Sequence, residues 1–238
     1  METGQRSATL RDIRDLCDLY GVTEENERQR LMDLAREGKQ PGWWQSYGLP
    51  YMTYVGLEQA ADSIRLYHCA IVPGLLQTGA YTRAIHEVGI IRLPDEVIEE
   101  RVKERATRQE LLTHATPPSV EIILDEAVLH RPVGGPSTMR EQLDRIIEVS
   151  KYPSVAIRVL PYDVGAHPAM ESDLTILSFQ GSAPSVVYVE GLVGQIYLER
   201  KAEVERYEQV FECLRDMAAS PEDSVDIITK LRDTCADD

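Results

Sequence analysis

Two short runs rich in β-branched residues, separated by a helical stretch, constrain the fold of this chain more than any other feature. The runs are VEIIL at 120–124 and VAIRVL at 155–160, and both are typical of strands. Between them Thr138 and Glu141, three positions apart, form a capping-box pattern that begins a helix. Because strands and helices bury their apolar faces against one another in layers, this order predicts a sheet with helices on at least one face.

The same patterns predict the other elements. Strands are expected at 174–180, 186–190 and 195–199, and the short stretch 191–194 indicates a hairpin. After the sheet, apolar residues on one side predict helices over 200–217 and 221–231, the second capped by Ser220. Before the sheet, helical spacing predicts five helices, over 7–19, 23–36, 53–67, 79–88 and 95–113, with Ser7 capping the first and Thr78 the fourth.

Together these elements predict an α+β fold, in which an N-terminal helical part is followed by a mixed sheet of about five strands covered by helices. Hydrophobic residues make up 43% of the chain and charged residues 27%, which is enough apolar material for a globular core. Two domains are expected, one over 1–38 and one over 39–238. The second divides into a helical subregion, 39–116, and a sheet subregion, 117–238.

The charge of the chain argues against direct DNA binding by most of its surface. Its 25 lysines and arginines are outnumbered by 40 aspartates and glutamates, so the formal net charge is -15. Affinity for nucleic acid comes chiefly from cations that neutralise phosphates. Any DNA-binding function must therefore come from a separate element or from a partner.

Features of a membrane, secreted or metal-binding protein are missing from the sequence. No apolar run is long enough to cross a bilayer, and the N-terminus METGQRSATL has no apolar region typical of a secretory signal, so we expect a cytoplasmic protein. The four cysteines are far apart, which predicts reduced, mostly buried thiols. The five histidines share no ligand spacing, so no metal or cofactor is predicted.

The first residues contain a helix end, a polar turn and a capped amphipathic helix. The string ETGQRSATLRDIRDLCDLYGV resembles the last third of an Xre-type helix-turn-helix domain, in which an ETG or ERG turn follows the recognition helix. The resemblance implies that the chain begins at or just after that helix, as a remnant of the module. Gln5 and Arg6 match turn positions that could touch a phosphate, but two such contacts give little affinity.

The rest of the chain resembles the large domain that follows an Xre module in many actinobacterial regulators, the WhiJ-like group. The strings that match appear in the family's order between residues 72 and 191: VPGLLQTGAY, RVKERATRQELL, LDEAVLHRPVGG, MREQL, VAIRVLP and VVYVEG. The resemblance implies a transcriptional regulator whose second domain senses a small-molecule effector or binds a partner. Some members are encoded beside small acidic proteins thought to be their partners. The resemblance implies no enzymatic activity.

The string LDEAVLHRPVGG joins a predicted strand to the next helix. Gly134 and Gly135 could let the backbone approach a ligand ahead of a helix N-terminus, and Arg131 could pair with an acid. Alternatively, the two glycines simply turn the chain and Glu126 pairs with Arg131. The second interpretation is favoured because two glycines commonly serve only to turn a chain.

Three arginines share one face of the helix predicted over 95–113. Arg101, Arg105 and Arg108 lie at i, i+4 and i+7, a spacing that suits an acidic partner, carboxylate or phosphate. Acidic residues are interleaved with them, so a solvated charged face is the favoured alternative.

The string VPGLLQTGAY has two interpretations as well. It is either a structural corner with Leu75, Leu76 and Tyr81 packed inside, or part of a hydrophobic groove.

Three hypotheses about function follow. The first is an effector- or partner-sensing domain of a transcriptional regulator. Such a regulator would bind DNA only if its helix-turn-helix is complete, and it could act as a homodimer. The second is a stand-alone, antitoxin-like module that binds proteins. The third is an enzyme with a pocket near Gly134, Gly135 and Glu190, where Glu126 and Glu171 would have to converge as well. We predict a non-enzymatic protein of the first kind.

Overall fold

A computed structural model describes residues 9–37, 42–47, 51–90, 92–181, 183–191 and 194–235. The chain divides into two compact units, Met1–Leu49 and Pro50–Asp238. The first unit contains helices α1, Leu10–Leu19, and α2, Glu25–Glu37, which pack against each other, and a short 3-10 helix η1, Trp43–Tyr47.

The N-cap of helix α1 lies two residues after the expected position, Ser7. Its N-cap is Thr9, whose Oγ1 accepts a hydrogen bond from the backbone N–H of Asp12, while the Asp12 carboxylate accepts one from the N–H of Thr9. Thr9 is preferred because an acid three positions later completes the capping box. Ser7, Gln5 and Arg6 lie outside the described residues, so the predicted phosphate contacts remain a prediction.

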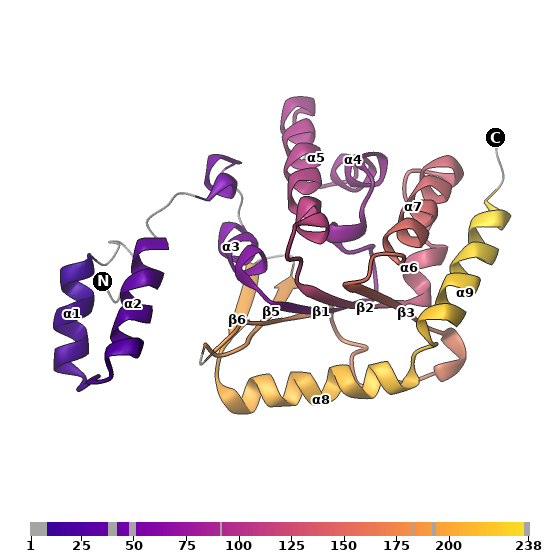
Figure 1. Ribbon diagram of the computed structural model, residues 1–238. Helices are drawn as coiled ribbons and strands as arrows, with labels where there is room; N and C mark the ends of the chain where they lie inside the picture. The colour runs from indigo at the N-terminus through magenta and orange to yellow at the C-terminus, as the bar shows by residue number, and fades with distance from the viewer. Residues whose placement is uncertain are drawn as a thin grey trace. The chain divides into compact units, whose positions relative to one another are not determined.

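The second unit is built around a six-stranded mixed sheet (Figure 1). The strand order is β3-β2-β1-β4-β5-β6. Strands β1, β2 and β3 are parallel, whereas β4, β5 and β6 continue the sheet in antiparallel fashion. The strands span Ser63–His68, Ser119–Asp125, Val155–Leu160, Leu174–Ser178, Val186–Gly191 and Gly194–Leu198, in chain order. The predicted α+β fold with a mixed sheet is confirmed.

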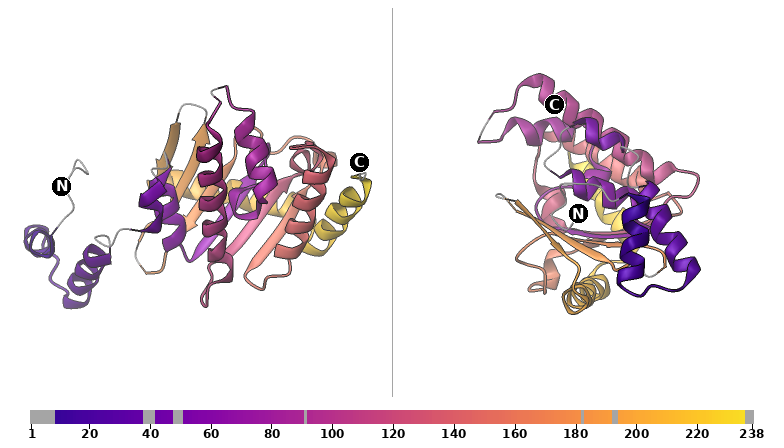
Figure 2. Two further views of the ribbon diagram at one scale, coloured as in Figure 1. Left: turned by 90° about the horizontal axis from the view of Figure 1, so that it is seen from above. Right: turned by 90° about the vertical axis from the view of Figure 1, so that its left-hand side faces the viewer.

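Helices cover both faces of this sheet (Figures 1 and 2). Five lie on one side: α3, Met52–Ala60; α4, Gly79–Glu87; α5, Asp95–Gln109; α6, Glu126–His130; and α7, Pro136–Val149. Helix α8, Lys201–Met217, crosses the other face, and α9, Pro221–Thr234, packs beside β3 and α7. Short 3-10 helices follow β1 (η2, Gly74–Leu76), α5 (η3, Glu110–Thr113) and β3 (η4, Tyr162–Val164).

The helix predicted over 53–67 is wrong in its second half. Helix α3 ends at Ala60, and Ser63–His68 forms strand β1, which pairs with both β2 and β4. Ile64 and Leu66 are buried at alternate positions, the period of a strand rather than of a helix. The sheet therefore has six strands instead of five, and the subregion expected to be helical contributes a central one.

Two smaller predictions also need correction. Helix α7 begins at Pro136 with Gly135 as its N-cap, not at the capping-box pattern of Thr138. Proline suits the first helical position because its missing N–H would have no partner there anyway. The thiols, expected to be mostly buried, are buried only at Cys17: Cys69 and Cys235 are partly exposed, and Cys213 is exposed on α8.

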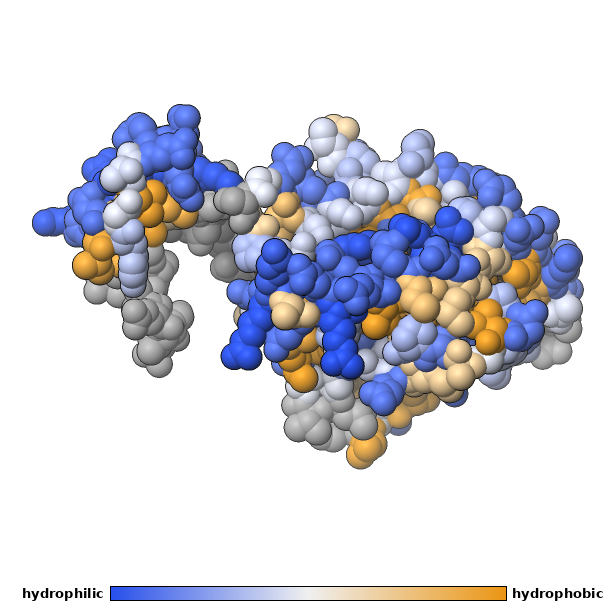
Figure 3. All heavy atoms as spheres, turned by 90° about the horizontal axis from the view of Figure 1, so that it is seen from below, coloured by the Kyte–Doolittle hydropathy of each residue, from blue (hydrophilic) through white to orange (hydrophobic). Residues whose placement is uncertain are grey.

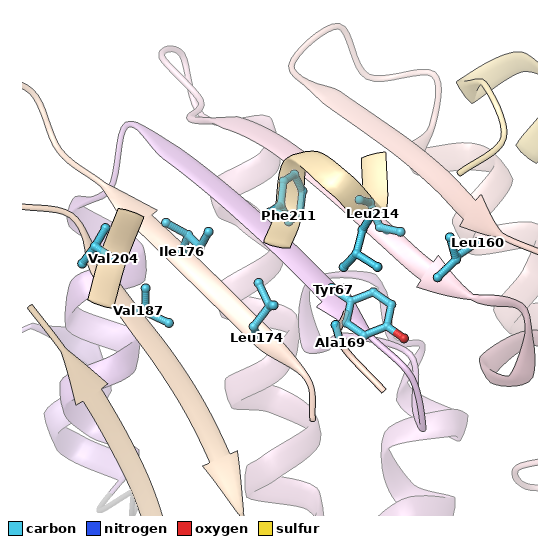
Figure 4. Packing of buried hydrophobic residues seen from close by; sticks show 10 residues of the cluster. Tyr67, Leu160, Ala169, Leu174, Ile176, Val187, Val204, Phe211 and Leu214 are labelled. Carbon is cyan, nitrogen blue, oxygen red and sulfur yellow. The ribbon is translucent and has the colours of Figure 1, made fainter. Parts of the chain in front are cut away.

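The core on the α8 side joins the helix to the strands beneath it (Figure 4). Phe211 and Leu214 of α8 point to Tyr67 of β1 and Ile176 of β4, and all four side chains are buried. The outer side of α8 has exposed polar residues, Lys201, Glu205, Arg206, Gln209 and Asp216, and hydrophilic side chains cover much of this face (Figure 3). Helix α8 is therefore amphipathic, as the spacing of its apolar residues predicts.

A buried glutamine fastens the turn after β1 to helix α7. Gln142 is fully buried; its Oε1 accepts a hydrogen bond from the Thr78 N–H at 2.8 Å, and its Nε2 donates one to the Leu76 carbonyl at 2.7 Å. We expect Gln142→Met to lower the free energy of unfolding by about 1–3 kcal/mol, because two buried backbone groups lose their partners. Urea unfolding measures this loss, and Gln209→Met on the exposed side of α8 should change stability by less than about 0.5 kcal/mol. Equal losses for the two variants would contradict the role of Gln142.

Candidate functional site

A cavity of about 280 Å³ lies among the end of β1, strands β4 and β5, and helices α3, η2, α4 and α5. Its apolar wall is formed by Leu66, Ile71, Val72, Leu75 and Ile85. The volume is near the lower end of the range for ligand pockets, about 300–1,000 Å³. A concave, mostly apolar site with several polar groups is the usual form of a small-molecule pocket.

One wall of this cavity holds a buried ion pair between α3 and α5. Arg108 Nε and Nη2 donate to the two carboxylate oxygens of Glu58 at 2.8 and 2.9 Å, and Arg108 is only 5% exposed while Glu58 is fully buried. Tyr54 donates its hydroxyl to Glu58 at 2.7 Å, and Tyr51 donates to Glu104 at 3.1 Å. Glu104, also fully buried, lies 3.6 Å from Arg108 Nη1. Two carboxylates thus compensate one buried guanidinium group.

Aromatic rings surround this ion pair. The ring centroids of Tyr54 and Tyr188 are 4.3 Å apart, and the Arg108 guanidinium carbon lies 5.4 Å from the Tyr54 ring and 5.8 Å from the Tyr51 ring. Burial and the neighbouring Glu58 raise the pKa of the Tyr54 hydroxyl well above its ordinary value, so this residue remains a hydrogen-bond donor at neutral pH. These tyrosines add apolar ring atoms and hydroxyl groups to the cavity wall.

The string VPGLLQTGAY forms both a packed corner and part of the cavity wall. Leu75, Leu76 and Tyr81 are buried, which confirms the structural interpretation. Gln77 acts as the polar centre of the corner: its Oε1 accepts hydrogen bonds from Arg105 Nη1 at 2.5 Å and from Thr82 at 3.1 Å. Its Nε2 donates to the Val72 carbonyl at 2.6 Å, so the loop is fixed from two sides.

A second pair of charged groups lies at the end of β1. His68 Nδ1 is 3.2 Å from Asp173 Oδ2, and the Cys69 N–H donates to Asp173 Oδ1 at 2.8 Å. Burial tends to raise the pKa of the Asp173 carboxyl, but His68 and the Cys69 N–H more than offset this, and the pKa lies below its ordinary value. Asp173 is therefore ionised at neutral pH and already compensated by its neighbours.

Three polar atoms of the lining residues are buried without a hydrogen-bond partner among the described residues. They are Nδ1 of His68, which is near Asp173 but not in hydrogen-bond geometry with it, Nε2 of His86 on α4 and Nε of Arg105 on α5. Burial, together with the positive charges of Arg105 and Arg101, lowers the pKa of His86 to about 4. His86 is therefore neutral at pH 7, and the potential around it is positive.

This depressed pKa gives a pH prediction. Since an unfolded histidine titrates near pH 6.5, the unfolded chain takes up a proton at His86 before the folded chain does. We expect stability to fall as the pH drops from about 6.5 to about 4, and the His86 ring resonances to stay constant in NMR spectra down to about pH 5. His86→Gln identifies the resonance and should reduce the pH dependence of unfolding. A midpoint near 6.5 for this ring would overturn the assignment.

The structure brings three of the predicted site residues to the cavity. Arg105, Arg108 and Glu190 line it, Glu190 from the exposed end of β5. The guanidinium carbon of Arg101 lies 6.0 Å from the ring of Tyr51, a cavity residue. The expectation of a solvated arginine face is wrong for Arg108. This side chain is buried and pairs with Glu58, which lies on another helix and 50 positions away in the sequence.

The remaining predicted residues lie elsewhere. Glu126 is bound to His130 at 3.1 Å and accepts the Tyr162 N–H at 2.8 Å, so the interpretation that pairs it with Arg131 is wrong. Over the described part of the chain, Arg131 forms no ion pair. These contacts keep Glu126 away from the cavity that Glu190 lines, while Glu171 lines a different one beside α8.

The two glycines of the same string turn the chain. Gly134 and Gly135 have φ angles of 71° and 87°, in the left-handed region that favours glycine. A Cβ at Gly134 would lie 2.8 Å from Thr138 Cγ2 and 3.0 Å from Ala84 Cβ, so its close approach is to protein atoms of α7 and α4. This geometry agrees with the turn interpretation.

Several cavity residues do not stand out in the sequence. Glu58, Tyr54 and His86 lie in ordinary helical stretches, and only a buried position distinguishes them from surface residues. The polar Gln77 at the end of the apolar run VPGLL is the one local hint of a polar group inside the fold. Pairing between residues 50 positions apart leaves no such local pattern.

Metal-binding clusters and membrane-spanning helices are both missing from the described residues. Nowhere in this part of the chain do three or more His, Cys, Asp or Glu side chains gather in a way that could hold a metal ion. None of the helices described is both long and apolar enough to span a membrane.

Comparison with known proteins places the chain in a family. Residues 51–230 match the family described as Domain of unknown function (DUF5753), which is most of the chain and covers the whole cavity. No helix-turn-helix family is detected, and no curated protein matches the sequence. The match extends over more than half of the chain, and the protein therefore belongs to the DUF5753 family.

Proposed function

We propose that residues 51–230 form the effector-sensing domain of an Xre-type transcriptional regulator and that the cavity between the sheet and α3–α5 is the effector site. The observation on which this rests is the cavity itself, whose mostly apolar wall holds Arg105, a guanidinium group without an ion pair among the described residues. Since a partly buried charge without a partner costs free energy, a ligand that pairs it gains affinity. The proposal is one of binding and not of catalysis.

The position of Tyr51 supports a sensing role. Tyr51 begins the helical segment of α3 as its N-cap, lines the cavity and donates its hydroxyl to Glu104. The chain leads from this residue back towards the N-terminal helices. An occupant that contacts Tyr51 can thus favour one arrangement of this segment over another. Such coupling requires the ligand to bind the two arrangements with different affinity.

DNA contact belongs, in this proposal, to a complete Xre-type module. The resemblance of the string ETGQR to the turn after a recognition helix supports this assignment. The net charge of -15 agrees with a division of labour, because so acidic a chain is expected to bind a duplex poorly without a dedicated basic surface.

Chromatin immunoprecipitation of the tagged full-length protein in its host tests the proposal. We expect enrichment at a small set of DNA sites, and we expect Gly74→Val to change the occupancy of these sites at least about threefold. A Cβ at Gly74 would already touch the cavity guanidinium groups at 3.4–3.6 Å, so the valine methyl groups would fill cavity space. Ala202→Val on the exposed start of α8 is the matched control. Absence of enriched sites, or equal occupancy in both folded variants, would contradict the sensor role.

A second candidate function is that of a protein-binding module of the antitoxin-like kind. The edge strand β6 favours it, because Ile196 on this strand is 57% exposed and edge strands readily pair with another chain. A pull-down from host extract with the protein and with Ile196→Lys distinguishes this function. A single stoichiometric partner lost in the variant, without any enriched DNA site, would favour it over the regulator.

A further inference from the structure

We infer that the effector is a small carboxylate or similar monoanion with a compact apolar body, and that its charged group binds Arg105 near His86. This inference rests on the proposed function and adds to it the chemical class of the ligand. The guanidinium groups beside Gly74, the missing ion pair of Arg105 and the low pKa of the neighbouring His86 each support it.

Two guanidinium groups converge on the position of Gly74. A Cβ built there would lie 3.6 Å from Arg105 Cζ and 3.4 and 3.5 Å from Arg108 Nη1 and Nη2. Because glycine has no side chain, both guanidinium groups can lie against the loop at the cavity wall. Guanidinium groups bind carboxylates through several parallel hydrogen bonds, so the Arg105 group, which has no carboxylate partner among the described residues, suits a carboxylate in the cavity.

The charged groups that line the cavity are unevenly paired. Glu58 binds Arg108 through two hydrogen bonds, whereas Arg105 forms no ion pair among the described residues. Two further acids line the cavity. Asp173 is held by His68, and Glu190 is exposed at the strand end, where water screens its charge. A ligand with one negative charge would give Arg105 the partner that it lacks.

The unpaired charge of Arg105 lies close enough to His86 to affect its ring. Arg105 uses Nη1 for the hydrogen bond to Gln77, and its charge is one of the two that hold the pKa of His86 low. Arg105 Nε and His86 Nε2 have almost no accessible surface, so the anion is expected to bind the part of the guanidinium group that lines the cavity. Its negative charge would offset that of Arg105 and stabilise protonated His86. Binding should therefore raise the pKa of His86.

The remainder of the cavity selects the body of the ligand. Leu66, Leu75 and Ile85 present apolar surface, and ring atoms of Tyr54 and Tyr188 complete the wall. With only about 280 Å³ available, the site suits a compound with a single ring. Simple aromatic and alicyclic acids meet both requirements, whereas nucleotides exceed the volume and the single charge.

Matched acids and amides test the inference with the full-length protein. The probes are benzoate and benzamide, phenylacetate and phenylacetamide, and cyclohexanecarboxylate and its amide, which differ within each pair mainly in charge. We expect at least one acid to bind with an affinity roughly tenfold or more above its amide and to shift the His86 ring resonance and raise its midpoint. Binding is followed by ligand-observed and histidine NMR at pH 7.

Three variants of α5 test whether the preference for acids depends on Arg105. Arg105→Gln should weaken the acid roughly tenfold or more and leave the amide within about twofold, whereas Lys103→Gln, an exposed position on the same helix, should change neither. A thermal melt confirms that each variant is folded. Arg105→Lys, which keeps the charge but not the planar fork, should recover part of the preference for the acid.

The outcomes separate this inference from the proposed function. If amides bind as tightly as acids and Gly74→Val abolishes both, the cavity is a ligand site but not an anion site, and the inference fails alone. If the acids bind without shifting His86, or Arg105→Gln has no effect, the inference is also overturned. If none of the six compounds binds at millimolar concentration, both the inference and the effector cavity are rejected.

Discussion

Replacing Glu58 with leucine should lower the free energy of unfolding by about 3 kcal/mol, one of the two largest effects of a single substitution that we expect. Removing one partner of a buried ion pair usually costs about 3–5 kcal/mol, because the other charge stays buried without compensation. Arg108 is 5% exposed and donates two hydrogen bonds to Glu58. We expect the lower end of the range because Glu104 remains 3.6 Å from Arg108 Nη1.

Urea unfolding of three variants measures this effect. The double variant Glu58→Leu/Arg108→Met should recover at least half of the loss, since no isolated charge is then left inside. Glu99→Gln is the matched control, because Glu99 pairs with Arg83 at an exposed position on α5 and the exchange should cost less than about 1 kcal/mol. A loss below about 1 kcal/mol for Glu58→Leu would show that the ion pair does not hold α3 to α5.

Replacing Phe211 with alanine should cost about 3–5 kcal/mol, the range measured for removal of a buried aromatic side chain. Phe211 is fully buried in the core between α8 and the sheet (Figure 4). The guanidinium carbon of Arg65 lies over this ring, 5.7 Å from its centroid, and this cation–π contact adds a smaller contribution to stability. The large loss follows from the lost apolar burial and from a cavity that the surrounding strands cannot close.

Thermal and urea unfolding check this prediction. Met170→Ala is a suitable control, since Met170 is 64% exposed and its truncation should change stability by less than about 0.5 kcal/mol. If the free energy of unfolding of Phe211→Ala lies within about 1 kcal/mol of that of the unsubstituted protein, α8 contributes little to the stability of the sheet. A separate, early loss of the α8 signal would show that this helix unfolds by itself.

Features of the fold that depend on neighbouring residues could be predicted from the sequence. The strand over Val155–Leu160 has the predicted bounds, and the caps Thr78 and Ser220 hold the helices that they were expected to begin. These features follow from side-chain shape, periodicity and capping within a few positions of the chain. Such local preferences act in the same way in most folds.

Strand β1 shows where local preference is insufficient. Its residues continue an apolar spacing that also fits a helix, and the earlier part of that spacing does form α3. What decides for a strand is the pairing of β1 with β2 on one side and β4 on the other, more than 50 and 100 positions away. Hydrogen bonds to two neighbours outweigh a weak helical preference.

The site divides in the same manner. The spacing of Arg101, Arg105 and Arg108 identified a row of charges on one helical face, and two of these residues line the cavity. The sequence did not reveal that Arg108 forms an ion pair with Glu58, whereas Arg105 has no carboxylate partner among the described residues. That difference depends on which side chain of another helix reaches each guanidinium group.

The sequence by itself determined the α+β class, most of the helices and strands, and the residue types able to bind an anion, since all of these follow from composition and short-range spacing. Only the tertiary structure decided that β1 is central, that Glu58 neutralises Arg108, and that His86 and Arg105 face a common cavity. The physical reason is that burial and pairing depend on distances in space between residues far apart in the chain. These distances also set the charge that each buried group retains.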